Sequence, residues 1–476
     1  MVHQYKNNGY NIVLDVNSGM VHVVDDLAYD IIKMYENSNR ESIIAAMVDK
    51  YTKPEFRELI SLEDEKNEDL EVNKKALQEE ISEVLEDIEQ LKADGALFTK
   101  DVYEDYIKDF KQRSTVVKAL CLHIAHDCNL ACKYCFAEEG EYKGHRELMS
   151  YEVGKKALDF LVENSGNRRN LEVDFFGGEP LMNMQVVKDL VKYGREQEAI
   201  HNKNFRFTLT TNGILLDDEI MEFANKEMSN VVLSIDGRKD INDYMRPSRN
   251  GKGSYDIIIP KFKKFAESRN QTNYYVRGTF THNNLDFAED VKHLAELGFK
   301  QISVEPVVAL PEEPYAIKEE DLPILFDEYD KLAKYMLERK KEGKSFNFFH
   351  FMIDMSGGPC VAKRLSGCGS GTEYLAVTPW GDLYPCHQFV GIDEFLLGNV
   401  EDGIIKTELK EEFKQCNVYT KDKCRDCFAK FYCSGGCVAN SYKFHNDIND
   451  TYDIGCALQK KRVECAIMLK AAEQQE

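Results

Sequence analysis

The sequence predicts an α/β protein built around a parallel sheet. From about Val117 onward, short apolar segments rich in β-branched and aromatic residues alternate with helix-compatible stretches. The apolar segments are residues 116–125, 171–178, 205–213, 231–237, 274–283 and 300–308. All but the last are followed by a helix-compatible stretch. This succession favours a parallel α/β barrel or an open sheet, whose chemistry lies at the carboxyl ends of the strands.

Composition narrows the class of protein. The chain has 476 residues and a formal net charge of −22, which argues against nucleic acid or an anionic membrane as the main partner. We see no apolar run near the ~18 residues of a membrane span and no signal peptide at the start, so we expect a cytoplasmic protein. In such a chain, the 14 cysteines indicate metal ligands or redox groups rather than disulfides.

Changes in the residue pattern along the chain indicate four regions. Residues 1–100 predict a small domain: two strands around a turn at residues 17–19, then helices from about Leu27, from about Glu41 and around residues 77–91, ended by Gly95. The acidic segment 61–71 is expected to be a solvated loop within it. Residues 101–116 are a linker, 117–340 the α/β region, and 341–476 a loop-rich region that holds most of the cysteines.

The stretch HDCNLACKYCF, residues 126–136, directly follows the first predicted strand. It places Cys128, Cys132 and Cys135 in a CxxxCxxC spacing. Three thiolates on a [4Fe–4S] cluster leave one iron open, and open coordination is typical of reactive rather than structural metal sites. The alternatives are a zinc loop completed by His126 or a remote residue, and cysteines that belong to the core.

This motif resembles the signature of the radical S-adenosylmethionine (SAM) enzymes, CxxxCx(aromatic)C, with Tyr134 as the aromatic residue. The resemblance implies a partial (β/α)6 barrel. It also implies that the open iron binds the amino and carboxylate groups of SAM. Reductive cleavage of SAM then gives a 5′-deoxyadenosyl radical that abstracts hydrogen from the substrate. An electron donor of the flavodoxin or ferredoxin type is expected as a partner.

The stretch FFGGEP, residues 175–180, ends the second predicted strand. Gly177 and Gly178 allow close approach of a ligand to the backbone, and Glu179 can accept from an ammonium group. In the resembled family this motif binds the amino group of SAM. The alternative is a tight strand-to-helix connection without a ligand.

Further polar residues fall at later strand ends: Asn212, Ser234, Asp236 and Arg277. By analogy with the family, Arg277 suits the SAM carboxylate, and Ser234 suits that carboxylate or the ribose. An ordinary turn or ion-pair role is the alternative for each of them.

The carboxyl-terminal region resembles the SPASM extension of radical SAM peptide-modifying enzymes. The matching cysteines are Cys368, Cys386 in GDLYPC, Cys424, Cys427, Cys433 and Cys437 in CRDCFAKFYCSGGC, and Cys456. The family assigns Cys424, Cys427, Cys433 and Cys456 to one auxiliary cluster, and Cys437, Cys368 and Cys386 to another. Zinc would accept the same ligands.

The second auxiliary set lacks one ligand. Cys360 is the candidate for it, and without Cys360 that cluster would have an open iron. The expectation is therefore three [4Fe–4S] clusters, one of them binding SAM. Cys121, Cys416 and Cys465 match no part of the pattern and are expected to be buried or incidental.

The amino-terminal pattern resembles the winged-helix-like modules that bind the leader of a ribosomally made precursor peptide as an added strand. Together with GYNIVLDVNSGMVHVVDD and residues 358–389, it is similar to the thioether-forming SCIFF (six-cysteine peptide) maturases of ranthipeptide and sactipeptide biosynthesis. The implied function is joining a cysteine sulfur to a carbon in a small Cys-rich precursor peptide. The alternatives are a SPASM-type formylglycine-generating sulfatase maturase, a quinone-cofactor peptide maturase, and a non-catalytic Fe–S or zinc peptide-binding module.

Overall fold

The computed structural model describes residues 1–53, 55–56, 70–105, 107, 112–355 and 361–475. The chain forms two compact units. The first contains Met1–Tyr106, Ile353–Pro359 and Arg462–Glu476, and the second contains Ile107–Met352 and Cys360–Lys461. Within the described ranges, every helix is too short or too polar to cross a membrane.

The first unit has an antiparallel sheet in the order β1-β2-β3. Its strands are β1 (Val2–Asn7), β2 (Tyr10–Asp15) and β3 (Val21–Val24). The predicted hairpin corresponds to β2 and β3, and the sequence analysis missed β1. The signal for β1 is the dipeptide Asn8-Gly9, which connects β1 to β2 with positive φ at both residues. That is the conformation of a two-residue hairpin turn.

Three helices complete the first unit: α1 (Asp26–Tyr35), α2 (Arg40–Tyr51) and α3 (Leu70–Ala93). They agree with the three predicted helices. Asp25 and Asn39 cap α1 and α2 by accepting from backbone N–H groups. The helices share a core with β2 through Val13, Ile31 and Ile81, which are fully buried. Of the acidic segment expected to be a loop, residues 61–69 lie outside the described residues, and Leu70 begins α3.

The second unit contains the predicted parallel strands, hydrogen-bonded in sequence order. They are β4 (Ala119–His126), β6 (Asn170–Gly177), β7 (Asn204–Thr211), β8 (Met228–Ser234), β9 (Tyr274–Phe280) and β10 (Gln301–Pro306). Every residue of β4 is buried, as is typical of a parallel strand covered on both faces. The sheet runs as an open path to β11 (Asn347–Phe348), so the barrel is partial.

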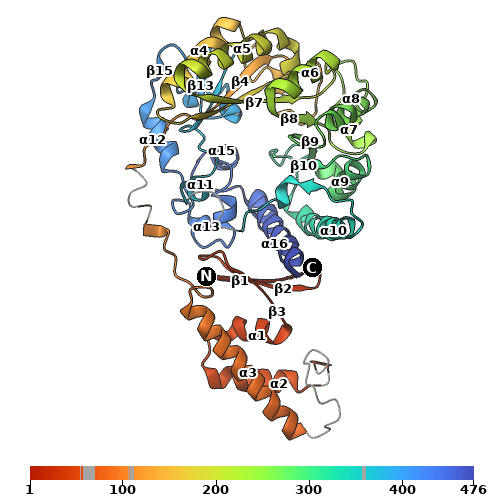
Figure 1. Cartoon of the computed structure of the whole chain (residues 1–476), viewed down its shortest axis with the longest axis vertical. Helices are drawn as coiled ribbons and strands as arrows, with labels where there is room; N and C mark the ends of the chain where they lie inside the picture. Colours follow the sequence, from red (N-terminus) through yellow and green to blue (C-terminus); the bar gives the residue numbers. More distant parts are fainter. Residues whose placement is uncertain (54, 57–69, 106, 108–111, 356–360, 476) are drawn as a thin grey trace. The chain divides into compact units, whose positions relative to one another are not determined.

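Helices follow the parallel strands and lie on the outer side of the curved sheet (Figure 1). They are α4 (Tyr151–Asn164), α5 (Met184–His201), α6 (Asp218–Glu227), α7 (Lys239–Met245), α8 (Tyr255–Ser268), α9 (Phe287–Glu296) and α10 (Leu322–Lys341). This alternation brings the carboxyl ends of the strands to one edge, where polar side chains from different strands meet.

The Cys-rich region is not only loops. Its strand β12 (Tyr374–Val377) pairs in parallel with β4, and β13 (Asp382–Tyr384), β14 (Gly398–Asn399) and β15 (Gly403–Ile404) continue the sheet. The region also contains the helices α11 (Val361–Ser366), α12 (Thr407–Gln415), α13 (Asp422–Arg425), α14 (Lys430–Cys433), α15 (Val438–His445) and α16 (Asp453–Gln475). Cys424 lies in α13, Cys433 in α14, and Cys456 in α16. A loop-rich region was expected here, and the structure adds short strands that extend the parallel sheet.

Candidate active site

The three cysteines of the CxxxCxxC motif line one cavity of about 280 Å³ at the carboxyl ends of the parallel strands. The loop leaves β4 at His126, and the Cys135 N–H donates to the Cys132 carbonyl at 3.1 Å. Of the residues named from the sequence, the cavity also includes Tyr134, Gly177, Gly178, Asn212, Ser234 and Arg277. The fold therefore gathers, around the cysteines, side chains that are far apart in sequence.

The donor set fits an iron–sulfur cluster. Burial raises the pKa of the Cys128 thiol to about 12 and that of Cys132 to about 11, so these thiols become ligands only when a metal displaces their protons. In the described part of the chain, no three His, Cys, Asp or Glu side chains converge as the ligands of a single metal ion do. Cys128, Cys132 and Cys135 are the residues that would hold a cluster with one open iron.

The contacts of His126 do not favour a role as a fourth ligand. Its Nε2 lies 2.9 Å from Nδ1 of His123, and both side chains are fully buried. The His126 ring stacks on Tyr142 at 4.7 Å between centroids. His126 therefore belongs to an aromatic cluster behind the cysteine loop.

The two glycines of the GGEP stretch place backbone against backbone. A Cβ on Gly178 would lie 2.1 Å from the Asp127 carbonyl oxygen, and one on Gly177, which has φ +119°, would lie 2.4 Å from that of Ala125. Both positions exclude larger side chains. The glycines thus hold the end of β6 directly against the residue before Cys128.

Glu179 has a different environment from the one predicted. Its carboxylate is fully buried, is absent from the cavity wall, and accepts from the backbone N–H groups of Leu181 (3.1 Å) and Asn212 (2.8 Å) and from the Thr211 hydroxyl (2.7 Å). Burial raises its pKa. In the structure Glu179 joins the ends of β6 and β7, and a direct contact with the SAM amino group stays a prediction.

Asn212 lies beside the cysteine loop. Its Nδ2 donates to Oδ1 of Asn129 at 2.7 Å and lies 3.6 Å from Sγ of Cys128. On the neighbouring strands, Ser234 and Arg277 are register partners in the cavity wall. The Arg277 guanidinium donates to Glu305 at 2.8 Å, so a SAM carboxylate would have to share it.

Asp236 is fully buried behind Tyr134. Both of its carboxylate oxygens accept from the Tyr134 hydroxyl, at 2.8 and 2.7 Å, and Oδ1 also accepts from the Thr279 N–H at 3.0 Å. Burial raises the pKa of Asp236 to about 6. Like Glu179, it does not line the cavity, and it fixes the side chain of the aromatic residue in the cysteine motif.

The sequence analysis missed Arg246. This side chain is 11% exposed, lines the cavity with the cysteines, and donates from Nη1 to the Tyr134 hydroxyl at 2.8 Å. It comes from the segment after α7, and no spacing in the sequence links it to the cysteine motif. His387 and Lys443, from the Cys-rich region, also line the cavity and were likewise not identified.

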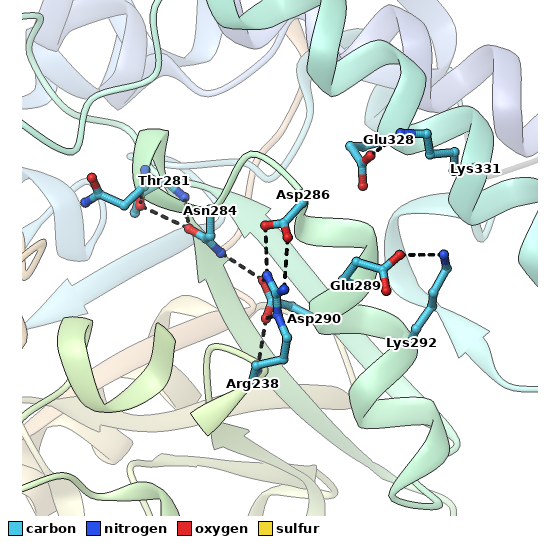
Figure 2. Close-up of polar contacts among 10 residues, drawn as sticks. Arg238, Thr281, Asn284, Asp286, Glu289, Asp290, Lys292, Glu328 and Lys331 are labelled. Atoms are coloured by element: carbon cyan, nitrogen blue, oxygen red, sulfur yellow. Dashed lines mark hydrogen bonds and ion pairs between the residues drawn. The ribbon is translucent and has the colours of Figure 1, made fainter. Parts of the chain in front are cut away.

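The loop that holds Asp236 is tied to the next strand-to-helix loop (Figure 2). Arg238 donates through two nitrogens to both oxygens of Asp286, at 2.9 and 2.8 Å, and through Nε to Asp290 at 2.8 Å. The two carboxylates raise the pKa of Arg238. Asn284 donates to the second oxygen of Asp290 at 3.0 Å, so this carboxylate is bonded on both oxygens.

The carboxyl-terminal cysteines form two groups. In the first group, burial raises the pKa of the Cys424 and Cys433 thiols, and charge on neighbouring thiols raises it further. The thiols that affect one another in this way are Cys424, Cys427, Cys433 and Cys456. In the same way, charge effects relate Cys386, Cys437 and Cys368 to one another. The SPASM resemblance implies the same two sets, and cluster binding by either of them stays a prediction.

The remaining cysteines separate clearly. Cys121, Cys416 and Cys465 are buried, as predicted, and Cys416 donates to the Ile448 carbonyl at 3.4 Å. Burial raises the pKa of the Cys416 thiol, with a smaller contribution from charge on Asp447 and Cys368. Cys360, the candidate for the missing ligand, lies outside the described residues.

Comparison with known proteins agrees with this geometry. Residues 122–294 match the model of the radical SAM superfamily. A cysteine-type anaerobic sulfatase-maturating enzyme of Clostridium perfringens is 27% identical over 65% of this chain and 85% of its own length.

Two solved structures have the same fold. That of anSMEcpe with bound AdoMet matches 76% of this chain and 96% of its own at a TM-score of 0.63 and 20% identity. The structure of Streptococcus suis SuiB bound to precursor peptide SuiA matches 96% of this chain and 100% of its own, at a TM-score of 0.52 and 17% identity. Together with the cysteine loop and its cavity, the family match identifies residues 122–294 as a radical SAM domain, and the two solved structures show that the fold extends beyond it.

Proposed function

We propose that this enzyme installs Cys sulfur-to-carbon thioether crosslinks in a small, ribosomally made, Cys-rich precursor peptide. The observation that carries the proposal is the combination of a cavity with three cysteines and two further cysteine groups in the same unit. In the described residues, these groups account for all of the thiols except the buried Cys121, Cys416 and Cys465.

A hydrogen atom on an unactivated carbon is beyond the reach of a protein acid or base at ordinary pKa values. Cys128, Cys132 and Cys135 would hold a [4Fe–4S] cluster, which together with SAM would supply the 5′-deoxyadenosyl radical chemistry that removes such an atom. Forming the carbon–sulfur bond removes one hydrogen atom from carbon and one proton from the thiol, and it releases one surplus electron. Each crosslink therefore lowers the peptide's mass by two hydrogens.

The chain's own residues position these groups. Gly177 and Gly178 lie in the cavity wall and hold the end of β6 against Ala125 and Asp127, and Asn212 and Ser234 add polar atoms to the same wall. Arg277 is the candidate for the SAM carboxylate. Glu179 and Asp236 hold the strand ends and Tyr134 in place from behind the wall.

The two carboxyl-terminal groups are proposed to hold auxiliary [4Fe–4S] clusters, which would accept the surplus electron or bind the substrate thiolate. Cys424, Cys427, Cys433 and Cys456 supply one complete set of ligands. Cys368, Cys386 and Cys437 supply three, and Cys360 would complete or leave open the fourth position. A low-potential donor of the flavodoxin or ferredoxin type would supply electrons in a cytoplasmic setting.

The first unit is proposed to bind the leader of the precursor. In its sheet β3 is an edge strand, paired with β2 on one side, and all four of its residues are partly exposed. In the described part of the chain no strand pairs with its other side. An extended peptide could add there through backbone hydrogen bonds. We assign residues 1–100 to this role, 101–116 to a linker, 117–340 to the radical SAM barrel and 341–476 to the auxiliary-cluster region.

The main alternative is formylglycine formation in a sulfatase, because a relative 27% identical is named as a sulfatase-maturating enzyme. The precursor-peptide proposal is favoured by the extent of the fold match. The SuiB structure, solved with a precursor peptide, matches 96% of this chain, whereas the anSMEcpe structure matches 76%. A quinone-cofactor peptide maturase and a non-catalytic Fe–S or zinc peptide-binding module remain the further alternatives.

The test is anaerobic reconstitution followed by incubation with SAM, dithionite and a Cys-rich peptide encoded beside the gene. We expect 5′-deoxyadenosine, together with a peptide lighter by two hydrogens per crosslink in mass spectrometry. The control is the variant with Cys128, Cys132 and Cys135 replaced by Ala. If the wild-type protein has its full iron content but forms no 5′-deoxyadenosine, the proposal that it is a radical SAM enzyme is refuted. Cleavage of SAM with a formylglycine product would favour the sulfatase alternative.

A further inference from the structure

Arg246 is held in a fixed register against the cysteine loop. The Lys133 N–H donates to the Met245 carbonyl at 2.9 Å, and the Ala131 N–H donates to the Pro247 carbonyl at 2.8 Å. Leu130 and Ser248 form an isolated antiparallel bridge beyond them. These backbone bonds lie on both sides of Arg246 and of Cys132, so the two residues face each other across the paired segments, and both line the cavity.

The guanidinium is buried, and its one nearby carboxylate lies beyond hydrogen-bond distance. Its Nη1 donates to the Tyr134 hydroxyl, and the nearest carboxylate oxygen, Oδ1 of Asp236, is 3.9 Å away. That carboxylate already accepts from Tyr134 and Thr279. The Nε of Arg246 is buried and has no hydrogen-bond partner in the described structure. A buried cation with an unused donor is costly unless an anion lies beside it.

The cavity offers such an anion when it is loaded. Three thiolates outweigh the charge of an oxidised [4Fe–4S] core, and one-electron reduction adds a further negative charge. In a cavity that excludes most water, a guanidinium stabilises the more negative state more strongly than it would in solvent. Arg246 shares the cavity wall with all three cysteines.

We propose that Arg246 is the buried cation that stabilises the reduced state of the cluster held by Cys128, Cys132 and Cys135, with Tyr134 and Asp236 fixing its guanidinium. The inference deepens the proposed function, because it assumes a cluster on these cysteines. The redox step is the addition of one electron from an external reductant to the oxidised cluster, with no bond to protein formed or broken. Arg246 acts on how favourable that addition is.

The experiment is a potentiometric titration of the reconstituted full chain, followed by electron paramagnetic resonance. The signal of this cluster is the one missing from the variant with Cys128, Cys132 and Cys135 replaced by Ala. We expect Arg246→Met to shift its midpoint to a more negative potential with iron content unchanged. Arg246→Lys keeps the charge and should shift it less. Tyr134→Phe removes the hydroxyl that orients the guanidinium and should give a smaller shift in the same direction.

Arg249→Met is the matched control. Arg249 lies three residues further along the same segment, but it is 35% exposed and pairs with Asp127, so solvent screens its charge. An unchanged midpoint in Arg246→Met, or an equal shift in Arg249→Met, would overturn the inference. If Arg246→Met holds no cluster, Tyr134→Phe decides: no shift in that variant also overturns it.

Two further readouts separate this role from others. If the anion beside Nε is the SAM carboxylate instead, Arg246→Met weakens SAM binding in calorimetry and leaves the midpoint unchanged, which contradicts the proposal. The midpoint can be measured whether or not SAM is cleaved. A wild-type protein that loads the cluster but forms no 5′-deoxyadenosine would therefore refute the proposed function and still allow this inference to be tested.

Discussion

Arg238 donates through both its backbone N–H and its guanidinium Nε to one oxygen of Asp290, at 2.9 and 2.8 Å, although Asp290 has no solvent exposure. The bonds join the loop after β8 to helix α9 (Figure 2). Gly237 makes the approach possible, since a Cβ there would lie 2.3 Å from Cβ of Asp290. The loop that presents Asp236 to Tyr134 is thus fixed by an ion pair outside the cavity.

Replacing Asp290 by Ala should lower the free energy of unfolding of the second unit by about 3 kcal/mol, because it removes a buried carboxylate that accepts from both Arg238 and Asn284. Chemical denaturation followed by fluorescence measures it, since the single tryptophan of the chain, Trp380, lies in that unit. Glu289→Ala is the control on the same helix. Its half-exposed pair with Lys292 should contribute at most about 0.5 kcal/mol, and equal losses in both variants would contradict the argument.

Asp236 predicts a pH dependence of stability. Burial raises its pKa from 3.8 to about 6, so between these values the folded state binds more protons than the unfolded state. The contribution of Asp236 to the free energy of unfolding is therefore highest at low pH. It falls as the pH rises toward 6 and stays constant at higher pH. The free energy of unfolding of wild type minus that of Asp236→Asn should decrease by up to about 3 kcal/mol between pH 4 and 6.5. A flat difference would rule out the raised pKa.

The close packing of Gly178 against Asp127 predicts that a larger side chain there would displace the cysteine loop. In Gly178→Ala, the added Cβ must displace the Asp127 carbonyl, 2.1 Å away, and Cys128 with it. We expect reconstituted protein with reduced iron content and weaker SAM binding, measured by iron analysis and calorimetry. Gly144→Ala is the control, because the nearest atom to its Cβ would be 3.4 Å away. Full iron and unchanged SAM affinity in Gly178→Ala would show that the loop can move without loss.

Much of the fold was predictable because its signals are local. The six parallel strands read as apolar segments, and the helices between them follow from length and spacing. The carboxyl-terminal strands were missed because they are short: β13 has three residues and β14 only two. They extend the sheet from β12, which pairs with β4 more than 200 residues away, and sequence spacing carries no information about that contact. The strand β1 is different, since Asn8-Gly9 was a local signal that the analysis passed over.

The candidate site was predictable where residues share a motif and not where they meet only through the fold. The three cysteines and the two glycines lie in short stretches with a recognisable spacing. Arg246 is more than 100 residues from Tyr134 and reaches it because α7 returns the chain to the cysteine loop. Glu179 and Asp236 were expected to contact the cofactor, and sequence alone could not show that both are buried outside the cavity lining, so such contact stays a prediction.

The final prediction concerns the number of clusters and separates the two ends of the chain. Wild type should bind about twelve irons per chain, four for each of three clusters. Cys427→Ser removes one ligand of the group with Cys424, Cys433 and Cys456, and should lower the count by about four while some SAM cleavage persists. Cys465→Ser is the control, because Cys465 is buried in the first unit beside Asn7 and should change neither quantity. A wild-type count near four, with zinc making up the balance, would contradict the auxiliary clusters and leave the SAM site intact. Loss of all iron in Cys427→Ser would instead show that the carboxyl-terminal group is needed to assemble the whole unit.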